Sequence, residues 1–250
     1  EYDDLSRLTK VTDNKYSPAK IIQYSYYEDG TRKTMLDPES NLTAYAYDAA
    51  KRLLTVTRNN VIEGTYQYNA LGLRTKLIEG NGAYTEYEYN HPLKWLTALY
   101  NKKSDGSIIS SFIYQHDKVG NRTRMDLFGG DYIVYGYDST YQLISEVRNG
   151  STPYALIWSY DEVGNRLTQN KNGVITNYTN NDANQLISEI SGLTPTVYAY
   201  DPNGNLITKT VGTTTYQWSY DYENRQTAYK NTINSGAYWY DAGGRRIKHT

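Results

Sequence analysis

One short motif, repeated along the chain at nearly regular intervals, constrains the fold more than any other feature. The motif opens with Tyr-Asp, continues through two variable residues to Gly, and ends with Asn or Arg, Leu and Thr. A fixed period near twenty residues is the signature of a repeat architecture, in which one unit stacks on the next. Copies of one unit build an extended surface or wall. The twelve copies begin at Tyr2, Tyr26, Tyr47, Tyr68, Tyr89, His116, Tyr137, Tyr160, Asn180, Tyr200, Tyr220 and Tyr240, in steps of 20 to 27 residues.

The residues before each motif predict a β-strand. The position two residues upstream is aromatic wherever it exists, and the residue between is mostly small or polar. Strict alternation of this kind indicates a strand with one packed face, and aromatic residues favour strands. The upstream aromatic residues are Tyr24, Tyr45, Tyr66, Tyr87, Tyr114, Tyr135, Trp158, Tyr178, Tyr198, Trp218 and Tyr238.

The centre of the motif predicts a tight turn. Asp or Asn fills the second position in every copy except at Tyr27, and these residues open turns by bonding their own downstream backbone. Gly or Asn three residues later is typical of a three-residue hairpin loop closed by a left-handed residue. The clearest structural motif residues are Tyr160, Asp161, Gly164 and Asn165, then Tyr200, Asp201, Gly204 and Asn205, then Tyr240, Asp241 and Gly244. Turns that are strained, differently built or longer are expected where the slot holds Ser6, Lys51, Leu93 or Tyr141.

A return strand and a second turn complete each unit. Residues 52–57 and 142–147 are typical return strands, and Gly/Asn-rich outer turns follow them, the longest in residues 102–106. We therefore predict an all-β fold of continuous antiparallel β-hairpin repeats. About two dozen strands twist too much to stay flat, so the sheet should coil into a spiral, as a hollow shell or tube segment. A six-bladed propeller is the competing architecture, but no modulation with a period of forty residues supports it.

Composition bounds the class of protein. Tyrosine is abundant, with 29 Tyr against 2 Phe, which suits a wall one sheet thick with water near both faces. The 26 Lys and Arg balance 27 Asp and Glu without a basic cluster, so a nucleic-acid partner is not expected. No apolar run approaches the roughly 20 residues of a membrane span. Cysteine is absent, which excludes disulfides and thiolate metal sites.

The motif Tyr-Asp-x-x-Gly-Asn-Arg-Leu-Thr is complete at residues 160–168 and recurs along the chain. In this the chain resembles the YD-repeat or rearrangement-hot-spot (Rhs) proteins over essentially its whole length. The family includes bacterial polymorphic toxins, insecticidal toxin-complex shells, wall-associated proteins and teneurins. The resemblance implies a β-sheet spiral coiled into a hollow cocoon, which in the toxins encloses a C-terminal effector. The family's aspartyl protease segment and effector are not matched here, so the resemblance implies a shell piece. His116 and Asn180 depart from the pattern by losing the leading Tyr.

The residues offer little catalytic or metal chemistry, so we expect no enzyme, no cofactor and no metal site. Asp161-Glu162, Asp221 with Glu223, and Glu86 with Glu88 are carboxylate pairs of the kind glycosidases use, but the Asp members belong to the turn motif. His91, His116 and His249 lack the spacing of metal ligands. Asp201 to Asn205 lacks the distal Glu of a calcium loop.

Two non-catalytic functions follow from these features. The first is a single YD-repeat array over residues 1–250, a segment of a longer extracellular or cell-surface bacterial protein, serving as shell, scaffold or filament. Its expected partners are flanking repeats or further copies at open strand edges, and an enclosed effector polypeptide. The alternative is an adhesin that binds surface glycans through Trp239, Trp158 and Trp218. Trp239 is the best candidate for exposure because it lies on the alternate face.

Overall fold

The chain folds entirely into short β-strands joined by turns. The computed structural model describes all residues 1–250 and contains 23 strands and no helix. Two compact units, Glu1–Tyr132 and Ile133–Thr250, are each built from the same kind of hairpin. The structure therefore confirms the predicted all-β class. It has no helix whose length and hydropathy would allow it to cross a membrane.

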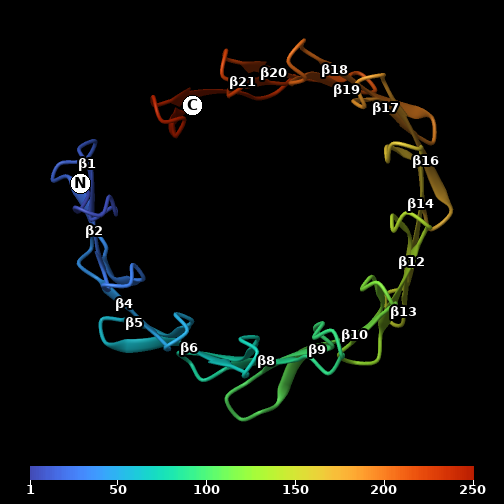
Figure 1. Ribbon diagram of the computed structural model, residues 1–250. Helices are drawn as coiled ribbons and strands as arrows, with labels where there is room; N and C mark the ends of the chain where they lie inside the picture. The colour runs from blue at the N-terminus through green and yellow to red at the C-terminus, as the bar shows by residue number, and fades with distance from the viewer. The chain divides into compact units, whose positions relative to one another are not determined.

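The first unit, Glu1–Tyr132, is a run of antiparallel hairpins in which each strand from β1 to β10 pairs with the next one along the chain (Figure 1). An isolated bridge between Tyr2 and Leu8 precedes β1. The strands are β1 (Lys10–Asp13), β2 (Lys20–Tyr26), β3 (Arg32–Leu36), β4 (Leu42–Tyr47), β5 (Leu53–Arg58), β6 (Val61–Tyr68), β7 (Arg74–Glu79), β8 (Tyr84–Glu88), β9 (Ala98–Lys102), β10 (Ile108–His116) and β11 (Arg122–Leu127).

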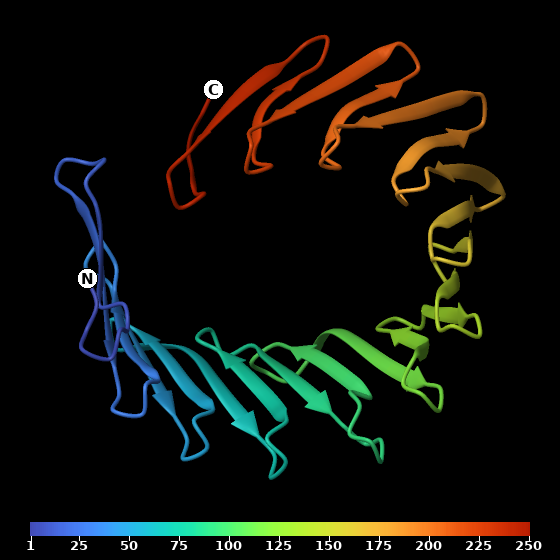
Figure 2. The ribbon, with the colours of Figure 1, turned by 45° about the horizontal axis from the view of Figure 1, so that its top comes forward.

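The second unit, Ile133–Thr250, repeats this arrangement, and each strand from β13 to β22 again pairs with its successor. Within each unit Figure 2 shows strands linked by short turns at both ends. Such a run has no separate four-stranded blades, which excludes the propeller. The strands are β12 (Tyr132–Tyr137), β13 (Leu143–Asn149), β14 (Tyr154–Tyr160), β15 (Arg166–Lys171), β16 (Val174–Asn180), β17 (Leu186–Ser191), β18 (Thr194–Tyr200), β19 (Leu206–Val211), β20 (Thr214–Tyr220), β21 (Gln226–Lys230), β22 (Ser235–Tyr240) and β23 (Arg246–His249).

The strand register separates the sheet into two faces. Trp158 lies opposite Gln169, Ser159 opposite Thr168, and Tyr160 opposite Arg166. Directly paired residues share a face and successive residues alternate between faces. We call the face that carries the upstream aromatic residue and the motif tyrosine the aromatic face, and the other the opposite face. A β-bulge just before the motif tyrosine inserts one extra residue into the return strand, and it recurs in eight other motif hairpins.

The sheet is a single layer, as the tyrosine content predicts. The only buried hydrophobic side chains are Ala98, 3% exposed, and Ile133, 6% exposed. Most strand residues are half-buried, because their neighbours lie beside them within the sheet and nothing is packed across it. Stability must therefore come from contacts between adjacent strands and repeats.

The motif turns have the predicted construction. The Gly164 amide donates to the Asp161 carbonyl at 3.1 Å, and the Asp161 amide donates to the Asn165 carbonyl at 2.9 Å. Gly164 has φ of 91°, in the left-handed region that disfavours residues with a Cβ. This is the expected type I turn closed by a left-handed residue.

The turns without Gly or Asn differ in two ways. Ser6, Lys51 and Tyr141 keep the same left-handed geometry, with φ of 59°, 60° and 65°, so these turns carry strain without being rebuilt. The repeat that begins at Tyr89 has its turn one residue later than the motif predicts. Its turn opens at His91 rather than Asn90, because the Lys94 amide donates to the His91 carbonyl at 2.8 Å, and Lys94 rather than Leu93 is left-handed.

Gly30 tests the conformational requirement alone, because no atom lies within 4 Å of an added Cβ there and its φ is +87°. Gly30→Ala is expected to lower the free energy of unfolding by about 1–2 kcal/mol through backbone strain. Gly30→Asn should lower it less, since Asn184 and Asn224 occupy the same slot at φ of 59° and 60°. Urea unfolding measures both losses, and equal losses for Ala and Asn would contradict this explanation.

Candidate functional site

The second motif residue holds its own turn together. In the repeat at Tyr160, the Asp161 carboxylate accepts backbone hydrogen bonds from Val163 at 3.1 Å and Asn165 at 2.7 Å through Oδ1. Its Oδ2 accepts from the Asn165 side chain at 2.8 Å. These bonds stabilise the charged form, so the Asn165 side chain, aided by the backbone amides, lowers the pKa of Asp161.

The same arrangement recurs through the chain. Asp201 accepts from Asn203 and from the backbone and side chain of Asn205, at 2.8 to 3.0 Å. Asp241 accepts from the Gly243 and Arg245 amides and pairs with the Arg245 guanidinium at 2.8 Å. The hydrogen bonds also lower the pKa of Asp201 and Asp241. The Asp of the motif is therefore a turn-closing group.

The Asn or Arg at the sixth position of the motif makes a contact forward to the next repeat. The Asn165 side chain donates to Asn184 Oδ1 in the following turn at 2.8 Å. Asn205 donates to Asn224 Oδ1 at the same distance. Where Arg takes the sixth position, its guanidinium makes the equivalent contact, as Arg52 Nη1 does with the Asn69 carbonyl at 3.3 Å. Adjacent turns are thereby tied side by side along one rim.

The leading tyrosine extends a second contact backward. Its hydroxyl donates to a backbone carbonyl in the return strand of the preceding repeat, at 2.9 Å from Tyr160 to Leu143 and from Tyr200 to Leu186. Tyr240 makes the same bond to Gln226 at 2.8 Å. Three more motif tyrosines do so in the first unit, namely Tyr26, Tyr68 and Tyr89. We call the combined forward and backward contacts the inter-repeat ladder.

One departure from the motif changes the ladder locally. His116 replaces the leading tyrosine, and the Trp95 ring lies 5.4 Å from it, centroid to centroid. His91 stacks on this indole with the ring centroids 4.1 Å apart, and a Cβ at Gly120 would come within 3.0 Å of the indole. Burial lowers the pKa of His116. An aromatic cluster thus fills the longest repeat.

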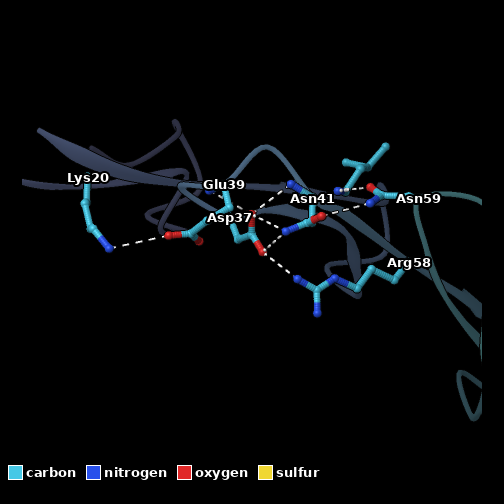
Figure 3. A network of polar contacts seen from close by, with 7 residues as sticks. Lys20, Asp37, Glu39, Asn41, Arg58 and Asn59 are labelled. Carbon is cyan, nitrogen blue, oxygen red and sulfur yellow. Dashed lines mark hydrogen bonds and ion pairs between the residues drawn. The ribbon is translucent and has the colours of Figure 1, made fainter. Parts of the chain in front are cut away.

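The opposite rim contains a motif-like turn, opened by Asp37, that the Tyr-Asp pattern does not predict. Asp37 accepts the backbone amides of Glu39 and Asn41 and the Asn41 side chain, as a motif Asp does (Figure 3). Arg58 reaches its Oδ2 at 3.1 Å, and Asn59 bonds Asn41 at 2.9 Å. The signal was present in the sequence, because residues 37–43 read Asp-Pro-Glu-Ser-Asn-Leu-Thr.

The tryptophans proposed to bind sugar lie in different settings. Trp239 is 42% exposed on the opposite face, with the Lys248 ammonium 4.5 Å from its ring. Trp218 is packed between Tyr216 and Tyr229 on the aromatic face. Trp158 is half-buried, and its indole nitrogen has no hydrogen-bond partner. The structure does not bring the three together, and carbohydrate binding stays a prediction.

The other candidate chemical groups are engaged in structural contacts. Glu86 lies between Lys102 at 2.6 Å and Lys76 at 3.1 Å, and the Lys102 hydrogen bond lowers its pKa. Asp221 pairs with Arg225 in its own turn. No group of three or more His, Asp and Glu is arranged to hold a metal ion. The site that the geometry supports is therefore the ladder itself.

Comparison with known proteins shows where such repeats occur. No protein-family model matches the sequence. The chain is 27% identical over 210 residues to the tRNA3(Ser)-specific nuclease WapA of Bacillus spizizenii. The matched region covers 82% of this chain and 8% of the nuclease. The chain thus spans a small part of that relative, whose name describes the whole protein.

Solved structures share the fold. The Tc holotoxin pore of Photorhabdus luminescens matches with a TM-score of 0.64 and 19% identity, over 89% of this chain and 14% of that one. A TcdB2–TccC3–TEV crystal structure matches with a TM-score of 0.67 and 17% identity, over 95% of this chain and 16% of that one. These likenesses confirm the predicted fold and the resemblance to YD/Rhs repeats.

Removal of one ladder hydroxyl should weaken the fold measurably. Tyr200→Phe keeps the ring but loses the bond to the Leu186 carbonyl, so the free energy of unfolding should fall by about 0.5–1.5 kcal/mol. Tyr222→Phe is the matched control, because that side chain is 88% exposed. Urea unfolding compares the two, and an equal effect at both positions would show that the hydroxyl bond does not stabilise the fold.

The turn carboxylates should make stability fall in acid. Their folded pKa values are lowered, so their contribution is present above about pH 4, the pKa region of an unfolded Asp, and is lost as pH falls through the folded values. Asp161→Asn should make this loss shallower, since Asn69 accepts the same two backbone bonds in its own turn. Urea midpoints between about pH 6 and 2 measure the effect. Identical acid profiles for the two proteins would contradict it.

Proposed function

We propose that this chain is part of the wall of a toxin-associated YD-repeat shell and that its role is structural. The inter-repeat ladder is the observation that carries the proposal. It uses equivalent atoms in many of the repeats to tie a hairpin to its neighbour, and this extends a wall without creating a unique site. The matches to toxin-complex structures support this function.

The proposed wall encloses a polypeptide. A single layer with few buried side chains presents two faces and two rims, which suits a barrier between two compartments. In this proposal the enclosed polypeptide is an effector that follows the repeats, as the family resemblance implies. Flanking repeats or further copies would continue the sheet by strand pairing at its edges. An extracellular or cell-surface bacterial location belongs to the same proposal.

Catalysis is assigned elsewhere in this proposal. The nuclease activity in the name of the Bacillus spizizenii relative belongs to a protein of which this chain matches 8%. Among the candidate carboxylates, Asp161 closes a turn and Glu86 pairs with lysine. We place any toxic activity in the enclosed segment rather than in the wall.

Protease protection tests enclosure directly. The chain is expressed with its natural flanking sequence and treated with a broad-specificity protease under native conditions. Enclosure predicts that the segment after the repeats stays intact, and that Tyr160→Ala combined with Tyr200→Ala, which removes two ladder contacts, exposes it. The same segment expressed alone is the control. Equal cleavage of the free and attached segments would reject the enclosing function.

A further inference from the structure

From β13 to β20 in the second unit, the opposite face is free of charge. The register from β13 to β20 assigns to this face residues that extend from Ser145 to Ser219. Every one of them is aliphatic, hydroxylated, Asn, Gln or Pro, although 21% of the whole chain is charged. Depletion of charge marks the surface that a protein uses for contact rather than for solubility.

The aromatic face of the same strands carries the charges instead. Glu146 and Glu189 accept the hydroxyls of Tyr154 and Tyr198 there, and Lys209 lies over the Tyr198 ring at 5.5 Å. Both faces belong to one layer, so the difference arises from the alternation of side chains along each strand. In the first unit the opposite face is charged at β7–β9, where Lys76, Glu86 and Lys102 are joined by ion pairs. From β2 to β6 the register assigns it no charged residue either. The stretch from β13 to β20 is the longer of these two neutral stretches.

Aliphatic side chains stand exposed on this neutral face. Ile157, Ile175, Ile190 and Val197 are 50%, 52%, 42% and 49% exposed. They are separated by polar residues, since Asn170 lies opposite both Ile157 and Ile175, and Asn177 lies opposite Ile190. A half-exposed Ile or Val gains free energy when a partner covers it.

The side chains of the neutral face indicate which kind of molecule can cover it. Phosphates find no cation on this face, which excludes nucleic acid. A second copy packed face to face would bury rows of hydroxyls, such as the Ser159–Thr168 pair, whereas sandwiched sheets bury continuous apolar faces. A charged segment would lose hydration without gaining a counter-charge. An extended polypeptide with apolar side chains and few charges fits isolated aliphatic residues spaced by hydroxyls.

We propose that the opposite face of β13–β20 is the surface that contacts the enclosed polypeptide, and that it holds segments of low charge. This inference rests on the proposed shell function and deepens it by naming the face. The aliphatic residues supply attraction, and the hydroxyls supply hydrogen bonds that many backbones can use. The charged aromatic face then meets bulk solvent.

Two labelled peptides of equal length test the selectivity by fluorescence anisotropy with the 250-residue chain. One contains Gly, Ser and Leu, and the other has half of its Ser replaced by alternating Asp and Lys. The uncharged peptide should bind, and the charged one should bind about tenfold or more weakly. Ile157→Lys combined with Val197→Lys should weaken the uncharged peptide about tenfold. Ile157→Ser combined with Val197→Ser is the milder pair, and thermal unfolding verifies that each variant folds.

Val163→Lys and Leu193→Lys are matched controls, because these aliphatic side chains are 71% and 100% exposed in turns away from the face. They should leave binding unchanged. Equal binding of the two peptides, or equal loss in the control variants, would overturn the inference. So would light scattering that shows a dimer which Ile157→Lys dissociates, because the face would then join two copies. Protease protection without peptide binding would reject this face and keep the shell, whereas peptide binding without protection would reject the shell.

Discussion

The structure depends on pairing between sequence neighbours, because a single-layered sheet has no core to hold distant parts together. Backbone hydrogen bonds join each strand to the next, and the motif adds two side-chain bonds between adjacent repeats. The tyrosine hydroxyl reaches back to a carbonyl of the preceding return strand, and the Asn or Arg reaches forward to the following turn. Each hydrogen bond contributes only about 0.5–1.5 kcal/mol, but the side-chain bonds recur along the chain and add to the backbone pairing.

The ladder also explains why the motif has its particular residues. Asp at the second position satisfies backbone amides of a turn that would otherwise point at water, and Gly at the fifth accepts a left-handed φ. Tyrosine is preferred over phenylalanine because its ring packs along the sheet while its hydroxyl bonds the neighbouring backbone. The proposed function follows from the same contacts between neighbouring repeats. A unit that binds only its neighbours extends into a wall, and the side chains that the ladder does not use are left to define what each face contacts.

Much of this arrangement was predictable from the sequence, because the motif is local. Alternation before Tyr160 placed β14, and Asp161 with Gly164 placed the turn that follows it. The turn at His91 was misplaced by one residue, since nothing in the sequence shows that a histidine ring nitrogen accepts the amide of Leu93 where Asn90 was expected to act. The turn at Asp37 was missed because its leading residue is Leu36 rather than Tyr.

The neutral face could not be found by alternation alone. The bulge skips Leu167, so Ser159 faces Thr168 while Tyr160 faces Arg166, and the face of a return-strand residue follows only once the register is known. Long-range pairing thus determines the surface, while local sequence determines the hairpin.

Hydrogen–deuterium exchange of a Tyr200→Ala variant tests the central claim most directly. If neighbour contacts hold the repeats, exchange should accelerate in β17 to β20, which surround the lost Tyr200–Leu186 bond, and return to the wild-type rate in more distant strands. Uniform acceleration along the chain, or no acceleration beside Tyr200, would contradict a structure maintained repeat by repeat.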